Sequence, residues 1–206
     1  MATHHIVTIV GSLRKESFSL KIANALARLA PPSLKLDVTT LHGISFFNQD
    51  LEANPPADWL AFREKLQKSH GVLFVTPEYN RGIPGVLKNA IDVGSRPYGE
   101  SVFDKKPGAI VTASPGSIGG FGANHQIRQA AVFLNMPIMQ QPEAYLGHVT
   151  DDSFDQDGCL KDGPLKDLVS VLAHAFANWV DMIHRSRQLL AEDSAHAAQQ
   201  KAKEPA

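Results

Sequence analysis

Serine and arginine side chains crowd a short segment that directly follows an apolar run. Residues 6–10 are rich in β-branched residues, and residues 11–19 then read Gly-Ser-Leu-Arg-Lys-Glu-Ser-Phe-Ser. Hydroxyls, a guanidinium and the free amides of a helix start are groups that bind phosphate in proteins. Three serines and an arginine exceed what helix capping needs, so we predict a phosphate site rather than a capped helix with solvated serines.

A second polar segment follows another apolar run, residues 72–75, and reads Thr-Pro-Glu-Tyr-Asn-Arg-Gly over residues 76–82. Tyr79 offers a flat face with a polar tip, and Asn80 could read the polar edge of a heterocycle. The alternative is a turn with one exposed tyrosine. Because both segments follow strand-like runs, they should meet at the carboxyl edge of a parallel sheet, where a phosphorylated planar cofactor would use both.

A third segment, residues 114–122, holds four glycines, which would let its backbone approach a ligand closely. A mobile surface loop is an equally open interpretation of it.

Residues 11–19 lack both G-x-G-x-x-G and the P-loop pattern, which disfavours a classical dinucleotide fold and a P-loop NTPase. They also lack the cysteine that a phosphatase loop needs as its nucleophile.

Strand-like and helix-like stretches alternate along the chain, which predicts an α/β fold with a doubly wound parallel sheet. The expected strands are residues 6–10, 34–38, 71–76, 107–113 and 136–139. The expected helices are residues 20–29, 59–66, 86–93, 124–134 and 165–190. We expect one domain over residues 1–190 and a polar, frayed tail over residues 191–206.

Composition excludes several classes of protein. The 206 residues carry 20 Lys and Arg against 21 Asp and Glu, so a net charge of -1 gives no field that attracts nucleic acid. No apolar run is long enough for a membrane span, no signal peptide is visible, and the single cysteine, Cys159, fits the cytoplasm. The acidic residues 151–158 fail the EF-hand register, and the histidines show no metal-ligand spacing, so no metal is expected.

The segments Gly11–Ser19 and Pro77–Asp92 closely resemble the NADPH-dependent FMN reductase family, and within it the bacterial quinone and chromate reductases. The resemblance implies a flavodoxin-like fold, a five-stranded parallel sheet of order 2-1-3-4-5 with helices on both faces. It also implies non-covalent FMN, NADPH or NADH as hydride donor, and a homodimer or homotetramer. The expected acceptors are quinones, free flavins, azo compounds or metal oxyanions such as chromate.

The resemblance also implies which residues bind the cofactor. Ser12, Arg14, Ser17 and Ser19 would hold the FMN phosphate, although many relatives have Asn at the position of Ser19. The full expected set is Gly11, Ser12, Leu13, Arg14, Ser17, Phe18, Ser19, Pro77, Glu78, Tyr79, Asn80, Ser114, Gly116 and Gly119. No catalytic side chain is expected, because the chemistry takes place on FMN; backbone amides around residues 79–80 could stabilise charge on the ring.

Two alternatives to a reductase stay open at this point. One is a flavodoxin-type electron carrier, although such carriers tend to be strongly acidic and this chain is nearly neutral. The other is a non-catalytic, regulatory protein that keeps the fold. The preference for NADPH or NADH is also open, since no site for the 2′-phosphate is evident in the sequence.

Overall fold

The chain folds around five parallel strands in the order β2-β1-β3-β4-β5. The computed structural model describes residues 3–201, and the side chains of residues 3–196. The strands are β1 (His4–Val10), β2 (Leu34–Thr40), β3 (Gly71–Thr76), β4 (Gly108–Ala113) and β5 (Ala144–Leu146). The helices are α1 (Phe18–Leu29), α2 (Ala57–Gln67), α3 (Gly85–Gly94), α4 (Phe121–Phe133) and α5 (Pro164–Lys201). The strand order confirms the predicted flavodoxin-like sheet.

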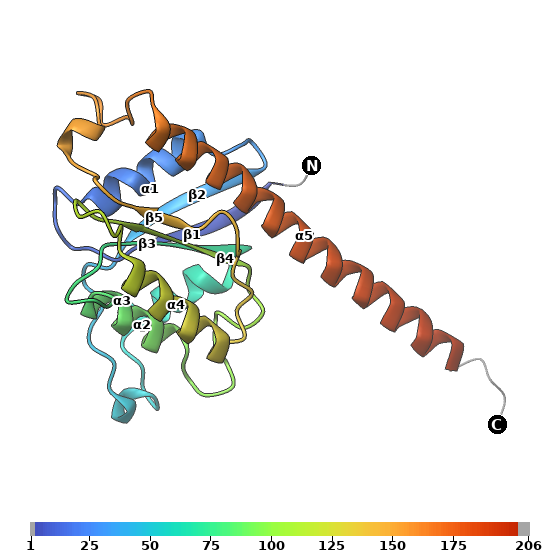
Figure 1. The fold of residues 1–206 in the computed structure, drawn as a ribbon. Coiled ribbons are helices and arrows are strands. Elements are labelled where there is room, and N and C mark those ends of the chain that lie inside the picture. The colour runs from blue at the N-terminus through green and yellow to red at the C-terminus, as the bar shows by residue number, and fades with distance from the viewer. Residues whose placement is uncertain (1–2, 202–206) are drawn as a thin grey trace.

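Helices cover both faces of the sheet. In Figure 1, α1 and α5 lie on one face, and α2, α3 and α4 lie on the other. Each face has its own apolar core: Leu26 and Phe176 pack on the first, and Phe62, Leu87 and Ile127 pack on the second. Strands β3 and β4 are buried along their whole length, which explains why their sequences are apolar without alternation.

The fifth strand is not where the sequence predicted it. Residues 136–139 form only one bridge to the start of β4, with the Met139 amide donating to the Gly108 carbonyl at 2.7 Å. Pro142 has no amide hydrogen with which to continue the ladder, so pairing with β4 resumes only at Ala144. The prediction of a strand at residues 136–139 is therefore wrong, and β5 is a short edge strand further along the chain.

Helix α5 is longer than predicted, because it continues past Leu190 to Lys201. Residues 191–201 contain no glycine or proline and are rich in alanine and glutamine, which favour helix. Figure 1 shows this last part of α5 extending beyond the sheet. The division into a domain (1–190) and a tail (191–206) stays a prediction, and residues 202–206 lie outside the described part. Among residues 3–201, no helix has the length and apolarity that crossing a membrane requires.

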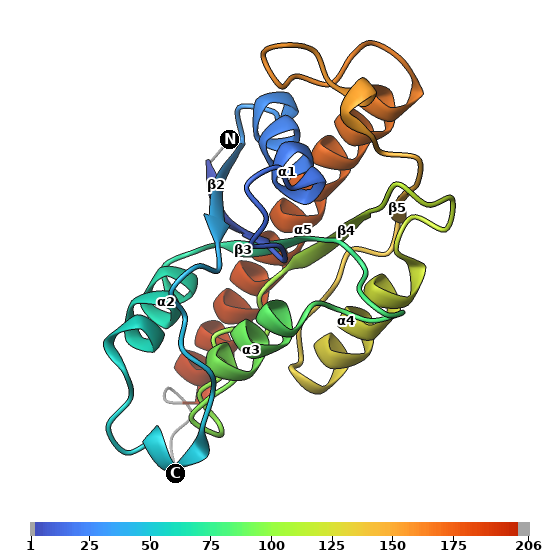
Figure 2. The ribbon, with the colours of Figure 1, turned by 90° about the vertical axis from the view of Figure 1, so that its left-hand side faces the viewer.

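All the connections from a strand to its following helix leave the same edge of the sheet. This carboxyl edge faces left in Figure 1 and faces the viewer in Figure 2. The connections after β1, β3 and β4 carry the three segments that the sequence predicted to bind a ligand. The connection after β2 lies beside them on the same edge, because β2 pairs with β1.

Two histidines at the amino edge of the sheet give stability a predictable pH dependence. The His5 amide donates to His70 Nδ1 at 2.9 Å, and His184 Nε2 lies 2.8 Å from the His70 carbonyl oxygen. Burial is the main cause that lowers the pKa of both His70 and His184 below 6.5. The surrounding ionisable groups are His4, His5, Lys106, Asp181 and Arg187.

Because the folded state disfavours protonation of these two rings, stability is fully present above the ordinary histidine pKa and falls as pH drops below it. We expect the melting temperature to fall by a few degrees between about pH 7.5 and 5.5. His184→Gln keeps a donor for the His70 carbonyl and should flatten this dependence. The exposed His174 on the same helix is the matched control: His174→Gln should leave the slope unchanged. Equal slopes in all three proteins would contradict the assignment.

Candidate functional site

The first loop leaves β1 in close contact with β3. The Gly11 amide donates to the Val75 carbonyl at 2.9 Å. A Cβ on Gly11 would lie only 2.2 Å from Thr76 Oγ1, so no larger residue fits here without movement of the backbone. Glycine thus allows the loop to begin directly over the carboxyl end of the neighbouring strand.

Helix α1 presents its free amides at the end of this loop. Ser17 is the N-cap, and its Oγ accepts from the Leu20 amide at 3.3 Å. The amides of Phe18 and Ser19 have no partner within the helix, because they belong to its first turn. Ser19 is 1% exposed, and its Oγ has no hydrogen-bond partner within the described residues. This group of donors suits an anion, which the positive end of the helix dipole also favours.

Two further residues of the loop complete the anion-binding group. Ser12 is buried, and its Oγ accepts from the Arg14 amide at 3.3 Å, which leaves the hydroxyl proton free to donate. Arg14 is exposed and forms no ion pair with any residue that the structure describes. A guanidinium in this position can bind two oxygens of one phosphate.

The second loop forms a tight turn with unusual backbone angles. Tyr79 and Gly82 exchange two backbone hydrogen bonds, of 2.9 and 3.0 Å. The residues between them, Asn80 and Arg81, both have positive φ, of 52° and 68°. Such angles cost free energy in residues other than glycine, and they concentrate at functional sites. Because the Tyr79 amide donates within the turn, it is not available to a ligand, contrary to our expectation for amides around residues 79–80.

The third loop packs against β5. Ser114 Oγ accepts from the Gly116 amide at 3.1 Å. Gly119 has a φ of +64°, and a Cβ there would lie 2.4 Å from the backbone of Tyr145. The space beside Gly116 is open by comparison, because a Cβ on this residue would meet only Ser114 Oγ, at an ordinary contact distance of 3.5 Å. Gly119 is therefore required by packing, and Gly116 leaves room beside the loop.

The first and second loops line one cavity of about 430 Å³ at the carboxyl edge. Among the residues predicted to bind, it contains Gly11, Ser12, Leu13, Arg14 and Tyr79. The other predicted residues do not line it: Ser17, Phe18, Ser19, Pro77, Glu78, Asn80, Ser114, Gly116 and Gly119.

The same cavity contains residues to which the sequence gave no role. These are Phe46, Pro84, Gly85 and Val86. Phe46 comes from the connection after β2 and is 78% exposed. No local sequence pattern distinguishes Phe46 from its neighbour Phe47. The sequence therefore did not predict which of the two would line the cavity. Only the pairing of β2 with β1 brings this connection to the cavity.

Comparison with known proteins decides the family. The family model described as NADPH-dependent FMN reductase matches residues 4–151, which is most of the chain. The chain belongs to the NADPH-dependent FMN reductase family. It is therefore an oxidoreductase, and FMN and NAD(P)H are its cofactors.

The chain aligns with individual relatives over nearly the whole length of each relative. A quinone reductase of Pseudomonas putida is 51% identical over 180 residues, covering 87% of this chain and 96% of the relative. A 2-hydroxy-1,4-benzoquinone reductase of Burkholderia sp. is 39% identical over 175 residues, covering 85% and 95%. The solved structure of FerB, a flavoenzyme NAD(P)H:(acceptor) oxidoreductase of Paracoccus denitrificans, has a TM-score of 0.81 at 33% identity and covers 87% of this chain and 98% of FerB.

In this FMN reductase the Glu78 carboxylate makes contacts that connect two elements of the fold. Its Oε2 accepts from the Ala123 amide at 2.9 Å, in the first turn of α4, and its Oε1 lies 3.5 Å from the Arg81 guanidinium. The carboxylate therefore joins the second loop to α4. Its negative charge is stabilised there by the helix dipole. Through this contact Glu78 positions the turn that carries Tyr79.

Glu78→Ala should lower the free energy of unfolding by about 1 kcal/mol, because it removes a hydrogen bond at a helix start. It should also weaken FMN binding, since the second loop loses its anchor on α4. Glu78→Gln, which keeps an oxygen acceptor, should lose less of both. The exposed Glu64 on α2 serves as control, because its ion pair with Lys68 is a surface contact far from these loops in sequence and Glu64→Ala should change little. Urea unfolding and FMN titration measure the two effects.

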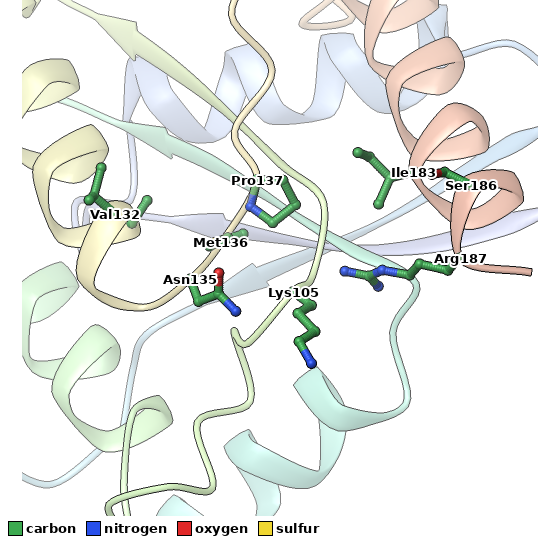
Figure 3. Close-up of a pocket in the computed structure, with 9 residues that line it drawn as sticks. Lys105, Val132, Asn135, Met136, Pro137, Ile183, Ser186 and Arg187 are labelled. Carbon is green, nitrogen blue, oxygen red and sulfur yellow. The ribbon is translucent and has the colours of Figure 1, made fainter. Parts of the chain in front are cut away.

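A second cavity, of about 370 Å³, lies at the amino edge of the sheet (Figure 3). It is lined by Lys105, from the segment before β4, and by Arg187, from α5. Burial, with help from Arg187, lowers the pKa of the neighbouring Lys106 to about 8. None of the residues predicted to bind FMN lines this cavity. The three segments predicted to bind FMN therefore lie at the opposite, carboxyl edge of the sheet.

Proposed function

We propose that this FMN reductase transfers two electrons from NAD(P)H to quinones. The observation that carries the proposal is that Arg14 of the first loop and Tyr79 of the second loop line one cavity. A phosphorylated flat cofactor needs a cation and an aromatic wall within one site, and these two loops supply both. The quinone reductases of Pseudomonas putida and Burkholderia sp. support the choice of acceptor.

We propose that the first loop holds the FMN phosphate. The contributing groups are the guanidinium of Arg14, the hydroxyls of Ser12, Ser17 and Ser19, and the free amides at the start of α1. The orphaned, buried Oγ of Ser19 fits this role, because a buried hydroxyl without a partner is costly unless a ligand satisfies it. Gly11, Leu13 and Phe18 supply backbone that surrounds the same anion.

We propose that the second and third loops border the flavin ring, through Pro77, Glu78, Tyr79, Asn80, Ser114, Gly116 and Gly119. Bound FMN would supply a ring that takes a hydride and passes two electrons on. The protein supplies position: the strained turn fixes Tyr79, and Glu78 anchors that turn to α4. The Asn80 amide has no acceptor among the described residues, so it can donate to a ligand where the Tyr79 amide cannot.

Further acceptors follow from the openness of the site. Leu13 and Tyr79 at the cavity are 40% and 47% exposed, so flat or anionic oxidants can reach it. We propose free flavins, azo compounds and metal oxyanions such as chromate as additional acceptors, with NADPH or NADH as donor.

We also propose that the protein is a cytoplasmic homodimer or homotetramer. Val132 and Phe133 on α4 are 82% and 81% exposed, and a subunit contact would bury this apolar pair. The absence of a disulfide partner for Cys159, the one cysteine of the chain, supports a reducing compartment.

The test is anaerobic mixing of the FMN-loaded protein with NADPH, followed by 1,4-naphthoquinone. We expect NADPH to bleach the flavin absorbance and the quinone to restore it, with one NADPH consumed per quinone reduced. A flavin that does not bleach would refute the proposed function. A flavin that bleaches but passes electrons only to a partner protein would favour the electron carrier. Protein that binds no FMN would favour the regulatory alternative.

A further inference from the structure

Phe46 is a large aromatic side chain at the cavity of about 430 Å³ that the first and second loops line. Its ring is 78% exposed, and it lines the cavity together with Leu13 and Tyr79. A single exposed apolar residue is ordinary on a protein surface. What distinguishes Phe46 is that hydrogen bonds and ring contacts hold both of its chain neighbours, Ser45 and Phe47, in place.

Four hydrogen bonds fix Ser45, which precedes Phe46. Its amide and its hydroxyl both donate to Asp58 Oδ2 at 2.7 Å. Its carbonyl oxygen accepts from Trp59 Nε1 at 3.1 Å and from Asn89 Nδ2 at 3.0 Å. The hydrogen bonds from Ser45 are the main cause that lowers the pKa of the Asp58 carboxyl, which keeps the acceptor charged at neutral pH.

Phe47, which follows Phe46, is fixed as firmly. Its amide donates to Asn89 Oδ1 at 2.7 Å. Its ring stacks on Trp59 with the centroids 5.4 Å apart, and the Arg96 guanidinium lies 5.5 Å from the centroid of the Phe47 ring. Contacts from α2 and α3 therefore hold the backbone on both sides of Phe46. The Phe46 ring itself has no such contact within the described residues and extends into solvent at the cavity.

A rigid backbone that presents an exposed ring is well suited to ligand recognition. The ordering cost of binding is small, because only the side-chain rotamer has to be fixed. An aromatic ring packed against a flat ligand contributes about 0.5–1.5 kcal/mol beyond the area that it buries. The turn that fixes Tyr79 gives the cavity a second aromatic side chain of restricted position.

We propose that Phe46 is a specificity-determining contact of this enzyme, packing on the ring of a quinone acceptor. The proposal rests on the proposed function. The cavity lining favours an uncharged planar ligand, because Arg14 is its one charged residue among those described and we assign that residue to the phosphate. The remaining side chains are mostly apolar or aromatic: Leu13, Phe46, Tyr79, Pro84 and Val86. A small inorganic acceptor would gain nothing from Phe46.

The experiment compares FMN-loaded wild type, Phe46→Ala and Phe46→Trp, with 1,4-naphthoquinone and ferricyanide as acceptors. For Phe46→Ala we expect kcat/KM for naphthoquinone to fall about tenfold, mostly through KM. The rate with ferricyanide, which has no ring, should stay within about twofold. Phe46→Trp should restore the quinone rate. Tyr98→Ala removes an equally exposed ring outside this cavity, and should leave both rates unchanged.

Three results would overturn the proposal. The first is an equal loss with naphthoquinone and ferricyanide. The second is weaker FMN binding in Phe46→Ala, which would make Phe46 a cofactor contact. The third is a changed oligomeric state of Phe46→Ala on size-exclusion chromatography, which would make it a subunit contact.

A binding measurement separates this proposal from the proposed function. Naphthoquinone binding to the FMN-loaded protein, measured by calorimetry without NADPH, requires no turnover. A wild type that does not reduce quinone refutes the proposed function. A dissociation constant about tenfold weaker in Phe46→Ala still supports the contact in that case, and equal dissociation constants overturn it.

Discussion

Replacing Arg14 with glutamine should raise the dissociation constant for FMN about 10- to 100-fold. Hydrogen bonds from a charged group contribute about 1.5–3 kcal/mol each, and every 1.4 kcal/mol is a factor of about ten. The Arg14 guanidinium is exposed and unpaired within the described structure, so its loss removes a ligand contact without exposing a buried partner. Fluorescence titration of the apoprotein with FMN at fixed ionic strength measures the change.

Two controls isolate the phosphate contact. Lys15 is the neighbouring exposed cation, and Lys15→Gln makes the same change in net charge. We expect Lys15→Gln to shift FMN binding less than about threefold, because a diffuse charge effect is screened by salt. Riboflavin, which has no phosphate, should bind wild type and Arg14→Gln equally. A comparable loss for riboflavin would contradict the phosphate assignment.

Gly119→Ala should lower the free energy of unfolding by about 3 kcal/mol. The positive φ of Gly119 costs alanine about 1–2 kcal/mol, and the new methyl would meet the backbone of Tyr145 at 2.4 Å. Backbone atoms cannot move aside as a flexible side chain can, so the third loop or β5 has to shift. The same displacement should weaken FMN binding, because this loop borders the proposed ring site. Urea unfolding and FMN titration measure both effects.

Other glycines of the chain provide matched controls for Gly119. Gly158 also has a positive φ, of +70°, but nothing lies within 4 Å of a Cβ at this position. Gly158→Ala should therefore show the backbone cost alone, about 1 kcal/mol. Gly116 lies in the same loop with open space beside it, and Gly116→Ala should be nearly neutral for stability. If Gly119→Ala were no worse than Gly158→Ala, the contact with Tyr145 would not matter.

The chemistry of the loops could be predicted because it is local. Ser17 caps α1 through a hydrogen bond to a residue three positions away, and such a contact depends only on nearby sequence. The apolar, β-branched run before Gly11 similarly predicts a buried strand. The alternation of strands and helices predicted a doubly wound parallel sheet, and the order of its strands came from the family resemblance alone.

The errors arose where pairing or long-range contacts decide the structure. Residues 136–139 are apolar enough for a strand, but after one bridge to Gly108 they are followed by Pro142, and β5 forms beyond it. The prediction that Glu78 borders the ring site did not include the contact of its carboxylate with the Ala123 amide, 45 residues away in sequence. No local pattern encodes that partner, so the positioning role of Glu78 became visible only in three dimensions.

By itself, the sequence determined that hydroxyls, a guanidinium and an aromatic ring follow two buried strands, and that a glycine-rich segment follows a third. These properties are set by residue type and by spacing over a few residues. The tertiary structure alone decided that Phe46 shares one cavity with Arg14 and Tyr79. Their connections follow three different strands, and they meet because β2, β1 and β3 lie side by side in parallel, which is a property of strand pairing and not of any single segment.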